Sequence, residues 1–245
     1  MRCAACGDGC PWVLPGDVSL PGTMTTMRIP SGEHMLAADL VEPETERSGY
    51  GVLFVHGYAS SRRSYIPRAT ELARRTGHTC LAFDLRGHGE SPGELPAMTR
   101  GQHVQDVVAA YDALAAAGVE RIGVCAASYG AYLSCLLLAE RAVERLLVRA
   151  PALYVDAEGP DPTGSRQHLR ELIDANPALR ALRAFDGRTL VLECERDEVI
   201  SQESIRGYLH AARHGTHHIL EGATHALSHE PWNVAFVDEI VDWFG

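Results

Sequence analysis

Ser128 is the residue of this chain best placed to act as a nucleophile. It lies in the sequence C-A-A-S-Y-G, between a β-like segment at 121–125 and a helix-like segment at 131–139. A nucleophilic serine sits on a tight strand-to-helix turn with small residues two positions before and after it, here Ala126 and Gly130, because the strained turn is crowded. The usual pattern is G-x-S-x-G, and alanine is the next smallest residue after glycine. The spacing predicts an exposed serine Oγ at the start of a helix.

A serine nucleophile needs a histidine base and a carboxylate that orients the base. Where the serine stands on such a turn, the acid and then the histidine follow it in the chain, each on a loop after a later strand. These loops meet at the carboxyl edge of the sheet. Asp197 follows a predicted strand at 189–193, and His225 follows a predicted strand near Ile219. These positions predict a triad of Ser128, Asp197 and His225.

The acid of this triad has alternatives in the sequence. Glu193, Glu195 and Glu198 lie within reach of the same loop, and Asp156 follows the preceding predicted strand. The alternative for His225 is a surface loop histidine, since the chain contains 12 histidines. Asp197 and His225 are preferred because both follow predicted strands in the required order.

Two backbone amides are expected to form an oxyanion hole, which stabilises the negative charge of a tetrahedral intermediate. The first is the amide of Tyr129, directly after the nucleophile. The second is the amide of Tyr58, in the sequence H-G-Y-A-S that follows the apolar run 51–55, where Gly57 permits a tight turn. The Tyr58 side chain is then replaceable, and the neighbouring His56 is expected to be structural.

Strands alternate with helices along the chain, which is typical of a mostly parallel central sheet with helices on both faces. The expected elements are a hairpin of Met24–Ile29 and Glu33–Val41 around the turn 30–32, strands at 51–55, 79–83, Val143–Val148, Arg188–Cys194 and His217–Leu220, helices near Tyr65–Arg75, Gln102–Ala117 and Trp232–Phe244, and the strand and helix around Ser128. We expect one α/β domain at 24–245 after a flexible leader at 1–23.

The segment 156–186 falls between two predicted strands and is rich in Gly and Pro at its start. Part of it must be the crossover helix that parallel strands require. Asn176 as a cap and Pro177 at the first helical position predict where that helix begins. The remainder is expected to form only a small cover over the site.

Composition and charge exclude several classes of function. The net charge of −10 argues against a nucleic-acid or anionic-membrane partner, and no apolar run is long enough for a membrane span. We expect a cytoplasmic protein, because the N-terminus has no apolar signal region and four of the seven cysteines lie in predicted core elements: Cys80, Cys125, Cys135 and Cys194. Cys3, Cys6 and Cys10 suggest a metal site, but a second pair of ligands is missing, so no metal is expected.

From about residue 24 onward the chain resembles the α/β-hydrolase family, and most of all its compact serine esterases and acyl hydrolases. The resemblance rests on the sequence H-G-Y at 56–58, the turn D-L-R-G-H-G-E-S at 84–91, the turn at Ser128, and Asp197 and His225. It implies that Arg86 and His88 belong to the scaffold. It also implies hydrolysis of a carboxylic ester through an acyl-enzyme, without a metal or organic cofactor; serine at 128 excludes the branches with an aspartate nucleophile.

Arginines near the site bear on the substrate, which we expect to be a small acyl compound. Arg62 and Arg63 follow the oxyanion loop, and Arg166 and Arg170 lie in the expected cover, so they could form a basic rim that binds an anionic substrate. The alternative is a solvated face paired with nearby acids. A thioesterase or acyltransferase with the same triad, and a ligand-binding protein without activity, are the alternative functions. The sequence indicates no oligomeric state.

Overall fold

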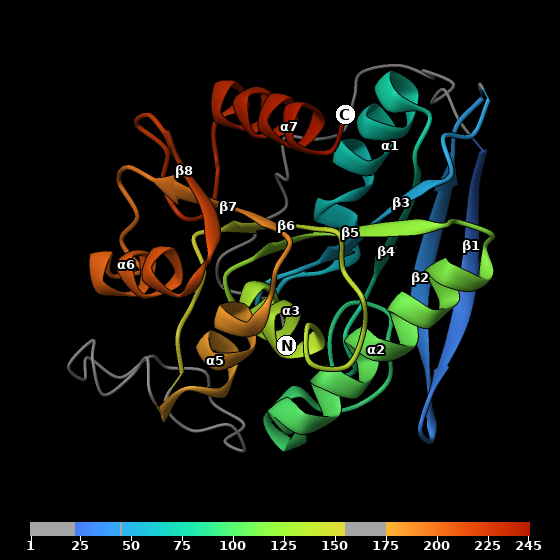
Figure 1. Ribbon diagram of the computed structural model, residues 1–245. Coiled ribbons are helices and arrows are strands. Elements are labelled where there is room, and N and C mark those ends of the chain that lie inside the picture. Colours follow the sequence, from blue (N-terminus) through green and yellow to red (C-terminus); the bar gives the residue numbers. More distant parts are fainter. Residues whose placement is uncertain (1–22, 45, 155–174) are drawn as a thin grey trace.

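The computed structural model describes residues 23–44, 46–154 and 175–245, and these form an eight-stranded sheet with helices on both faces (Figure 1). The strand order is β1-β2-β4-β3-β5-β6-β7-β8. The strands are β1 (Thr23–Ser31), β2 (His34–Glu42), β3 (Tyr50–Val55), β4 (Thr79–Phe83), β5 (Arg121–Ala127), β6 (Arg145–Arg149), β7 (Arg188–Cys194) and β8 (His214–Leu220). Strands β3 to β8 are parallel, whereas β2 pairs antiparallel with both β1 and β4. The expected fold class is confirmed.

Helices cover the sheet in two layers. α1 and α7 pack together on one face, and α2, α3, α5 and α6 pack side by side on the other (Figure 1). The helices are α1 (Ile66–Thr76), α2 (Arg100–Ala116), α3 (Tyr129–Leu137), α5 (Pro177–Ala184), α6 (Gln202–Ala211) and α7 (Glu230–Phe244), with short 3-10 helices η1 (Arg62–Ser64) and η2 (Leu95–Ala97). Each face of the sheet therefore has its own apolar core.

The central strands form because they are apolar on both sides. Every residue of β3 and of β4 is buried, as expected of parallel strands covered by helices on both faces. Alternate residues of β3 belong to different cores: Leu53 and Val55 face α2 and α3, while Val52 and Phe54 face α1 and α7. The ends of β3 and β5, next to Tyr58 and Ser128, thus lie in the middle of the sheet.

Several helices begin where their sequences provide a cap. Thr99 accepts a hydrogen bond from the Gln102 amide, and the Gln102 side chain accepts one from the Thr99 amide, which makes a capping box at α2. The Asn176 side chain accepts hydrogen bonds from the amides of Ala178 and Leu179, so α5 begins with Pro177 as predicted. These caps satisfy amides that have no partner within the helix.

The sequence misses one helix and shortens one strand. α6 was not expected as an element, and β8 begins at His214 rather than at His217. β8 is an edge strand of which only Leu220 is buried, so the strand carries little apolar pattern. The expected leader at 1–23 lies almost wholly outside the described residues, and so does most of the segment 156–186, where a small cover is expected. The end of that segment contains α5, which begins at Pro177.

The four core cysteines are buried free thiols, as expected. Burial raises the pKa of each thiol. Within the described ranges, no helix has the length and apolar character needed to cross a bilayer. Over the same ranges, His, Cys, Asp and Glu side chains nowhere gather in a group that could hold a metal ion; Cys3, Cys6 and Cys10 lie outside them.

Candidate active site

Ser128 lies at the carboxyl end of β5 and caps the N-terminus of α3. Its backbone has φ 51° and ψ −118°, a strained conformation for a residue with a side chain. The last residue of β6 and the segment that follows it hold this backbone on both sides. The Ser128 amide donates to the Arg149 carbonyl at 3.0 Å, and the Ala152 amide donates to the Ser128 carbonyl at 3.1 Å. The expected strained turn is present, and a neighbouring strand fixes it.

Gly130 allows α3 to start directly against β3. A Cβ at this position would lie 2.4 Å from the carbonyl oxygens of both Val55 and His56. No side chain fits there, so the small residue two positions after Ser128 is required by packing. The close approach brings the loop after β3 next to the nucleophile.

His225 and Asp197 form a hydrogen-bonded pair at the ends of β8 and β7. His225 Nδ1 donates to Asp197 Oδ2 at 2.8 Å. Asp197 Oδ1 accepts hydrogen bonds from the amides of Val199 and Ile200, at 2.8 and 2.7 Å. Burial alone would raise the pKa of Asp197, but the hydrogen bonds from His225 and from these amides outweigh it and hold that pKa below its ordinary value. Asp197 is therefore ionised at neutral pH, and its bond to Nδ1 orients the His225 ring.

The other acids of this loop have different partners. Glu193 contacts His217 Nε2 at 2.8 Å and also binds Gln202. Glu195 accepts a hydrogen bond from the Gly222 amide, and Glu198 contacts the backbone amide of His225, at 3.4 Å. Among the candidate acids that the structure describes, Asp197 is thus the one bonded to the imidazole; Asp156 lies outside the described residues.

The loop after β3 lies against Ser128, where the sequence expects the oxyanion hole. A Cβ at Gly57 would be 3.3 Å from Ser128 Cβ and 3.9 Å from its Oγ. The His56 side chain links this loop to the loop after β4. Its Nε2 accepts a hydrogen bond from the Leu85 amide at 3.1 Å, and its Nδ1 donates one to the Gly57 carbonyl at 2.7 Å. Since the N–H of a trans peptide points opposite to its C=O, this bond turns the Tyr58 amide away from His56.

His56 has a structural place in this loop. It is completely buried, and burial, together with nearby His88, lowers its pKa to about 3. A neutral imidazole that both accepts and donates a backbone hydrogen bond is a fixed link between two loops. The expectation that His56 is not a second base agrees with this environment.

An aromatic and imidazole cluster surrounds the side chain of Tyr129, whose amide is expected to be the other oxyanion donor. The Tyr129 hydroxyl is 2.8 Å from His103 Nδ1, and the Tyr129 ring makes edge contacts with Tyr58, His103 and Tyr154. No pattern in the sequence marks His103 or Tyr154 as a neighbour of Tyr129. Each is a single residue far from Tyr129 in the chain, so the amino-acid sequence alone does not indicate the contact.

Backbone strain gathers at this edge of the sheet. Four non-glycine residues of the described chain have positive φ: Ala59, Ser128, Ala150 and Leu227. They lie in the loops that follow β3, β5, β6 and β8. Strained residues of this kind cluster at functional sites, where the surrounding structure holds them in place.

Arg62 is buried in the scaffold rather than exposed on a rim. Its side chain is 5% exposed, and its guanidinium binds Asp39 at 2.7 Å, Glu90 at 2.9 Å, and Asp84. Arg63 is exposed and pairs with Glu90. The position expected for Arg62 is therefore wrong, because this arginine neutralises two buried carboxylates. Arg166 and Arg170 lie outside the described residues.

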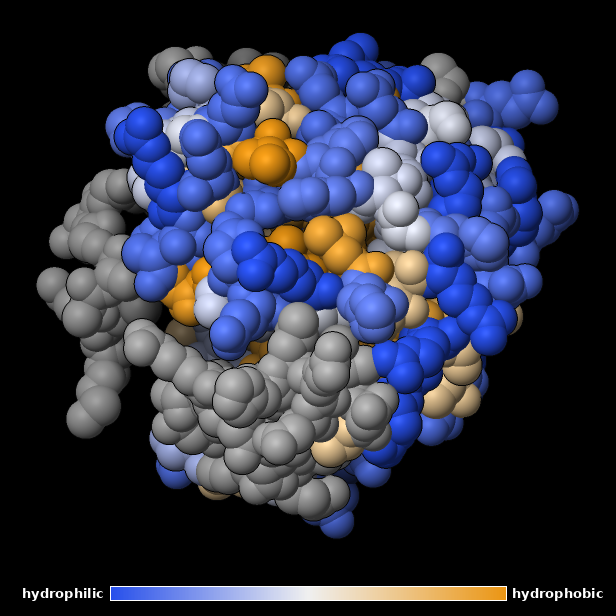
Figure 2. Space-filling model, turned by 60° about the vertical axis from the view of Figure 1, so that its left-hand side comes forward, coloured by the Kyte–Doolittle hydropathy of each residue, from blue (hydrophilic) through white to orange (hydrophobic). Residues whose placement is uncertain are grey.

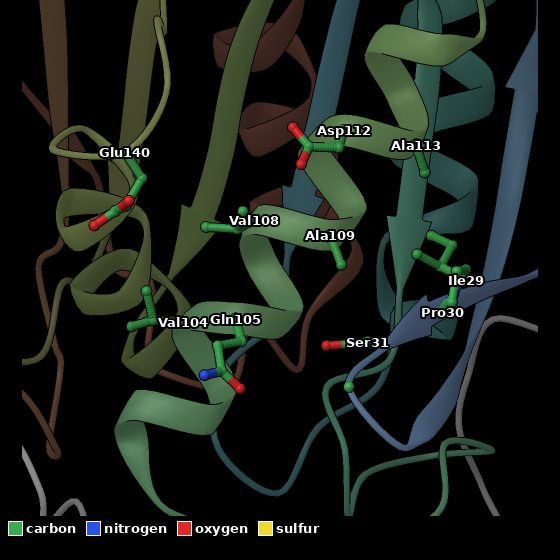
Figure 3. A pocket seen from close by; sticks show the side chains of 11 residues that line it. Ile29, Pro30, Ser31, Val104, Gln105, Val108, Ala109, Asp112, Ala113 and Glu140 are labelled. Atoms are coloured by element: carbon green, nitrogen blue, oxygen red, sulfur yellow. The ribbon is translucent and has the colours of Figure 1, made fainter.

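A surface pocket of about 700 Å³ lies between the end of β1 and α2 (Figure 3). Its lining is mostly apolar and comprises Ile29, Pro30, Ser31, Gly32, Val104, Gln105, Val108, Ala109, Asp112, Ala113 and Glu140. Ser128, Asp197 and His225 do not line it. The pocket and the candidate active site are separate features of the molecule.

The face of the molecule shown in Figure 2 is mainly polar. Figure 2 shows a face on which the coloured residues are mostly hydrophilic and the hydrophobic ones form small, separate areas. Two of the exposed large hydrophobic residues, Tyr58 and Val199, belong to the loops that carry the candidate site. Apolar surface is thus available beside the Asp197–His225 pair.

Comparison with known proteins gives one family. A model of the alpha/beta hydrolase family matches residues 52–189. Among solved structures, the esterase Pf2001 of Pyrococcus furiosus is 20% identical, with a TM-score of 0.70 over 95% of this chain and 96% of that chain. Est1E of Butyrivibrio proteoclasticus, solved with ferulic acid bound, is 18% identical, with a TM-score of 0.72 over 88% of this chain and 96% of that chain. At these identities the structural likeness concerns the fold.

Proposed function

The chain belongs to the alpha/beta hydrolase family, and from this premise we propose that it is a serine hydrolase that cleaves carboxylic esters of small acyl compounds. One observation carries the proposal most. His225 Nδ1 is bonded to an ionised Asp197 at 2.8 Å, on the two loops that follow β7 and β8. This pair leaves Nε2 of His225 free of a proton, as a general base requires.

In the proposed mechanism, Ser128 Oγ attacks the ester carbonyl while His225 Nε2 takes the hydroxyl proton. Asp197 stabilises the imidazolium that forms. The C–O bond to the leaving group then breaks, and the alcohol departs with the proton from His225 Nε2. Water, deprotonated by the same nitrogen, attacks the acyl-enzyme; collapse of that second intermediate releases the carboxylic acid and returns the proton to Ser128.

The amides of Tyr58 and Tyr129 are proposed to stabilise the oxyanion. Tyr129 is the first residue of α3, so its amide has no partner within the helix. The His56 bond to the Gly57 carbonyl supports the inward direction of the Tyr58 amide. Loss of one such donor costs about 3 kcal/mol of transition-state stabilisation.

An ester substrate is supported by the kind of surface at the site. Exposed apolar groups of Tyr58 and Val199 could contact an acyl chain. One of the solved structures with the same fold, Pf2001 of Pyrococcus furiosus, is described as an esterase. The arginine expected to bind an anionic substrate, Arg62, is instead paired inside the protein, so the proposal is for neutral esters.

Turnover of p-nitrophenyl esters from acetyl to palmitoyl tests this function, with Ser128→Ala as the control. We expect the wild type to release p-nitrophenol on the order of 10⁴-fold or more faster than the variant, because the variant lacks the nucleophile. The chain-length optimum then gives the size of the acyl site. Equal rates for both proteins, or cleavage only of acyl thioesters, would contradict the proposal.

A further inference from the structure

The structure assigns a positioning role to Arg149: we propose that this residue sets the distance between the nucleophile and the base. The inference rests on the proposed function, because it concerns how Ser128 and His225 of that site are aligned. Arg149 is the last residue of β6, between β5 and β7 in the sheet. It therefore lies between the strand that carries Ser128 and the strands that carry Asp197 and His225.

Arg149 contacts both halves of the site directly. Its carbonyl accepts the hydrogen bond from the Ser128 amide at 3.0 Å. Its Nη1 donates to the backbone carbonyl of His225 at 3.0 Å. A single residue thus binds the main chain of the nucleophile through its own main chain, and the main chain of the base through its side chain.

The guanidinium of Arg149 is buried without an ion-pair partner among the described residues. The residue is 9% exposed, and within the described chain no carboxylate lies within ion-pair distance of it. Its remaining contacts are the Cys194 sulfur at 3.3 Å and the Phe236 ring at 5.4 Å. Its Nε is buried and has no hydrogen-bond partner among the described residues.

A buried cation without a carboxylate destabilises a fold, because desolvation of the charge is not offset by an opposite charge. An apolar side chain would fill this position at lower cost. The bond to the His225 carbonyl is the contact that an apolar side chain would lose. The hydrogen bond to the His225 carbonyl is therefore the contact that would offset the cost of burying Arg149, and it aligns His225.

The other hydrogen bond that the structure gives the His225 main chain is long. Its amide contacts the exposed Glu198 at 3.4 Å, and the next strained residue of the same loop is Leu227. The Asp197 bond fixes the ring of His225, whereas the Arg149 bond fixes its main chain relative to β6. Without that bond the ring stays oriented, but its Nε2 moves relative to Ser128 Oγ.

The test compares Arg149→Met with Arg145→Met. Arg145 is the first residue of the same strand, and its Nη1 likewise donates to a backbone carbonyl, that of Trp243, at the opposite end of β6. A hydrogen bond from a charged group corresponds to a change on the order of 10- to 100-fold. We expect Arg149→Met to lower kcat by about that factor with KM changed less than about twofold, and Arg145→Met to leave kcat within about twofold.

A double-mutant cycle separates positioning from simple destabilisation. If Arg149 acts through His225, Arg149→Met has no further effect on the residual rate of a His225→Ala variant. A loss of the same factor in both backgrounds, or an unchanged kcat in the single variant, would overturn the inference. Arg149→Lys keeps the positive charge and can still donate a hydrogen bond, but it lacks the guanidinium group. It is expected to lose less of the rate than Arg149→Met. If Arg149→Met does not fold, the partial loss in Arg149→Lys is measured instead.

Hydrogen exchange gives a readout that does not depend on turnover. Amides of residues 223–227 are expected to exchange at least tenfold faster in Arg149→Met than in the wild type, and at the wild-type rate in Arg145→Met. Equal exchange in all three proteins refutes the role of Arg149 even if the enzyme is active. Conversely, a wild type without esterase activity refutes the proposed function, while the exchange rates still decide whether Arg149 holds the His225 loop.

Discussion

At the scale of single residues, the structure separates charged groups that serve the scaffold from those that serve the site. Asp197 has its hydrogen-bond acceptors filled by His225 and by two backbone amides. Arg62 is occupied by buried acids of β2 and of the loop after β4. Burial and partners, which determine these roles, depend on residues distant in the chain.

Arg62→Met is expected to destabilise the fold by about 3–5 kcal/mol, because it leaves Asp39 and Asp84 buried without their cation. Arg63→Met is the matched control: its exposed pair with Glu90 is worth less than about 1 kcal/mol. Urea unfolding at pH 7 measures both. Similar losses for the two variants would show that Arg62 does not neutralise these acids.

The residues of the candidate site can be proposed from the sequence, whereas the residues that support them cannot. Ser128 and His225 can be chosen from the residues next to them in the sequence. Ser128 lies on a predicted turn between a strand and a helix, and His225 lies on a loop after a predicted strand. The choice of Asp197 over Glu193 or Glu198 depends on a contact with His225 across 28 positions. Arg149, His103 and Arg62 act through partners on other elements, so no local pattern marks them.

At the scale of elements, the site depends on how closely α3 approaches β3. The backbone of Gly130 contacts the carbonyl oxygens at the end of β3, which places the start of the helix beside the loop of Gly57. Elements with strong local signals, such as β3 or the capped start of α5, are predicted well from the sequence. The polar edge strand β8 and the missed helix α6 carry weaker apolar patterns, and their positions follow from packing against β7.

Gly130→Ala is expected to lower the free energy of unfolding by more than about 2 kcal/mol, because its Cβ would overlap two backbone carbonyls. Gly101→Ala is the control within α2, where the nearest atom to a new Cβ is 4.0 Å away. There the substitution is expected to stabilise by about 0.5 kcal/mol, through helix propensity. Thermal and urea unfolding measure the difference; equal effects would contradict the close approach of α3 and β3.

At the scale of the whole molecule, buried neutral histidines link stability to pH. Burial lowers the pKa of His56 to about 3 and that of His103 to about 4, from an ordinary value of 6.5. The folded state therefore binds fewer protons than the unfolded state below pH 6.5. The stability these residues contribute is complete above that pH and is lost as pH falls toward the folded-state values.

Between pH 7 and pH 5, each of these two histidines is expected to reduce the free energy of unfolding by about 2 kcal/mol. Urea unfolding at both pH values measures the total. His103→Gln should remove one of the two contributions, whatever its effect at pH 7. An unchanged pH dependence in this variant would mean that His103 is protonated in the folded state.

The proposed serine-hydrolase function depends on Ser128 being an activated nucleophile, and covalent labelling of Ser128 tests this most directly. An alkyl fluorophosphonate reacts with a serine that has a working base and oxyanion hole. Peptide mapping by mass spectrometry is predicted to find a single adduct on Ser128, formed at least 100-fold more slowly in His225→Ala because the base is lost (on the order of 10²–10⁴). Absence of an adduct on the wild type, or an adduct on another residue, would contradict the account.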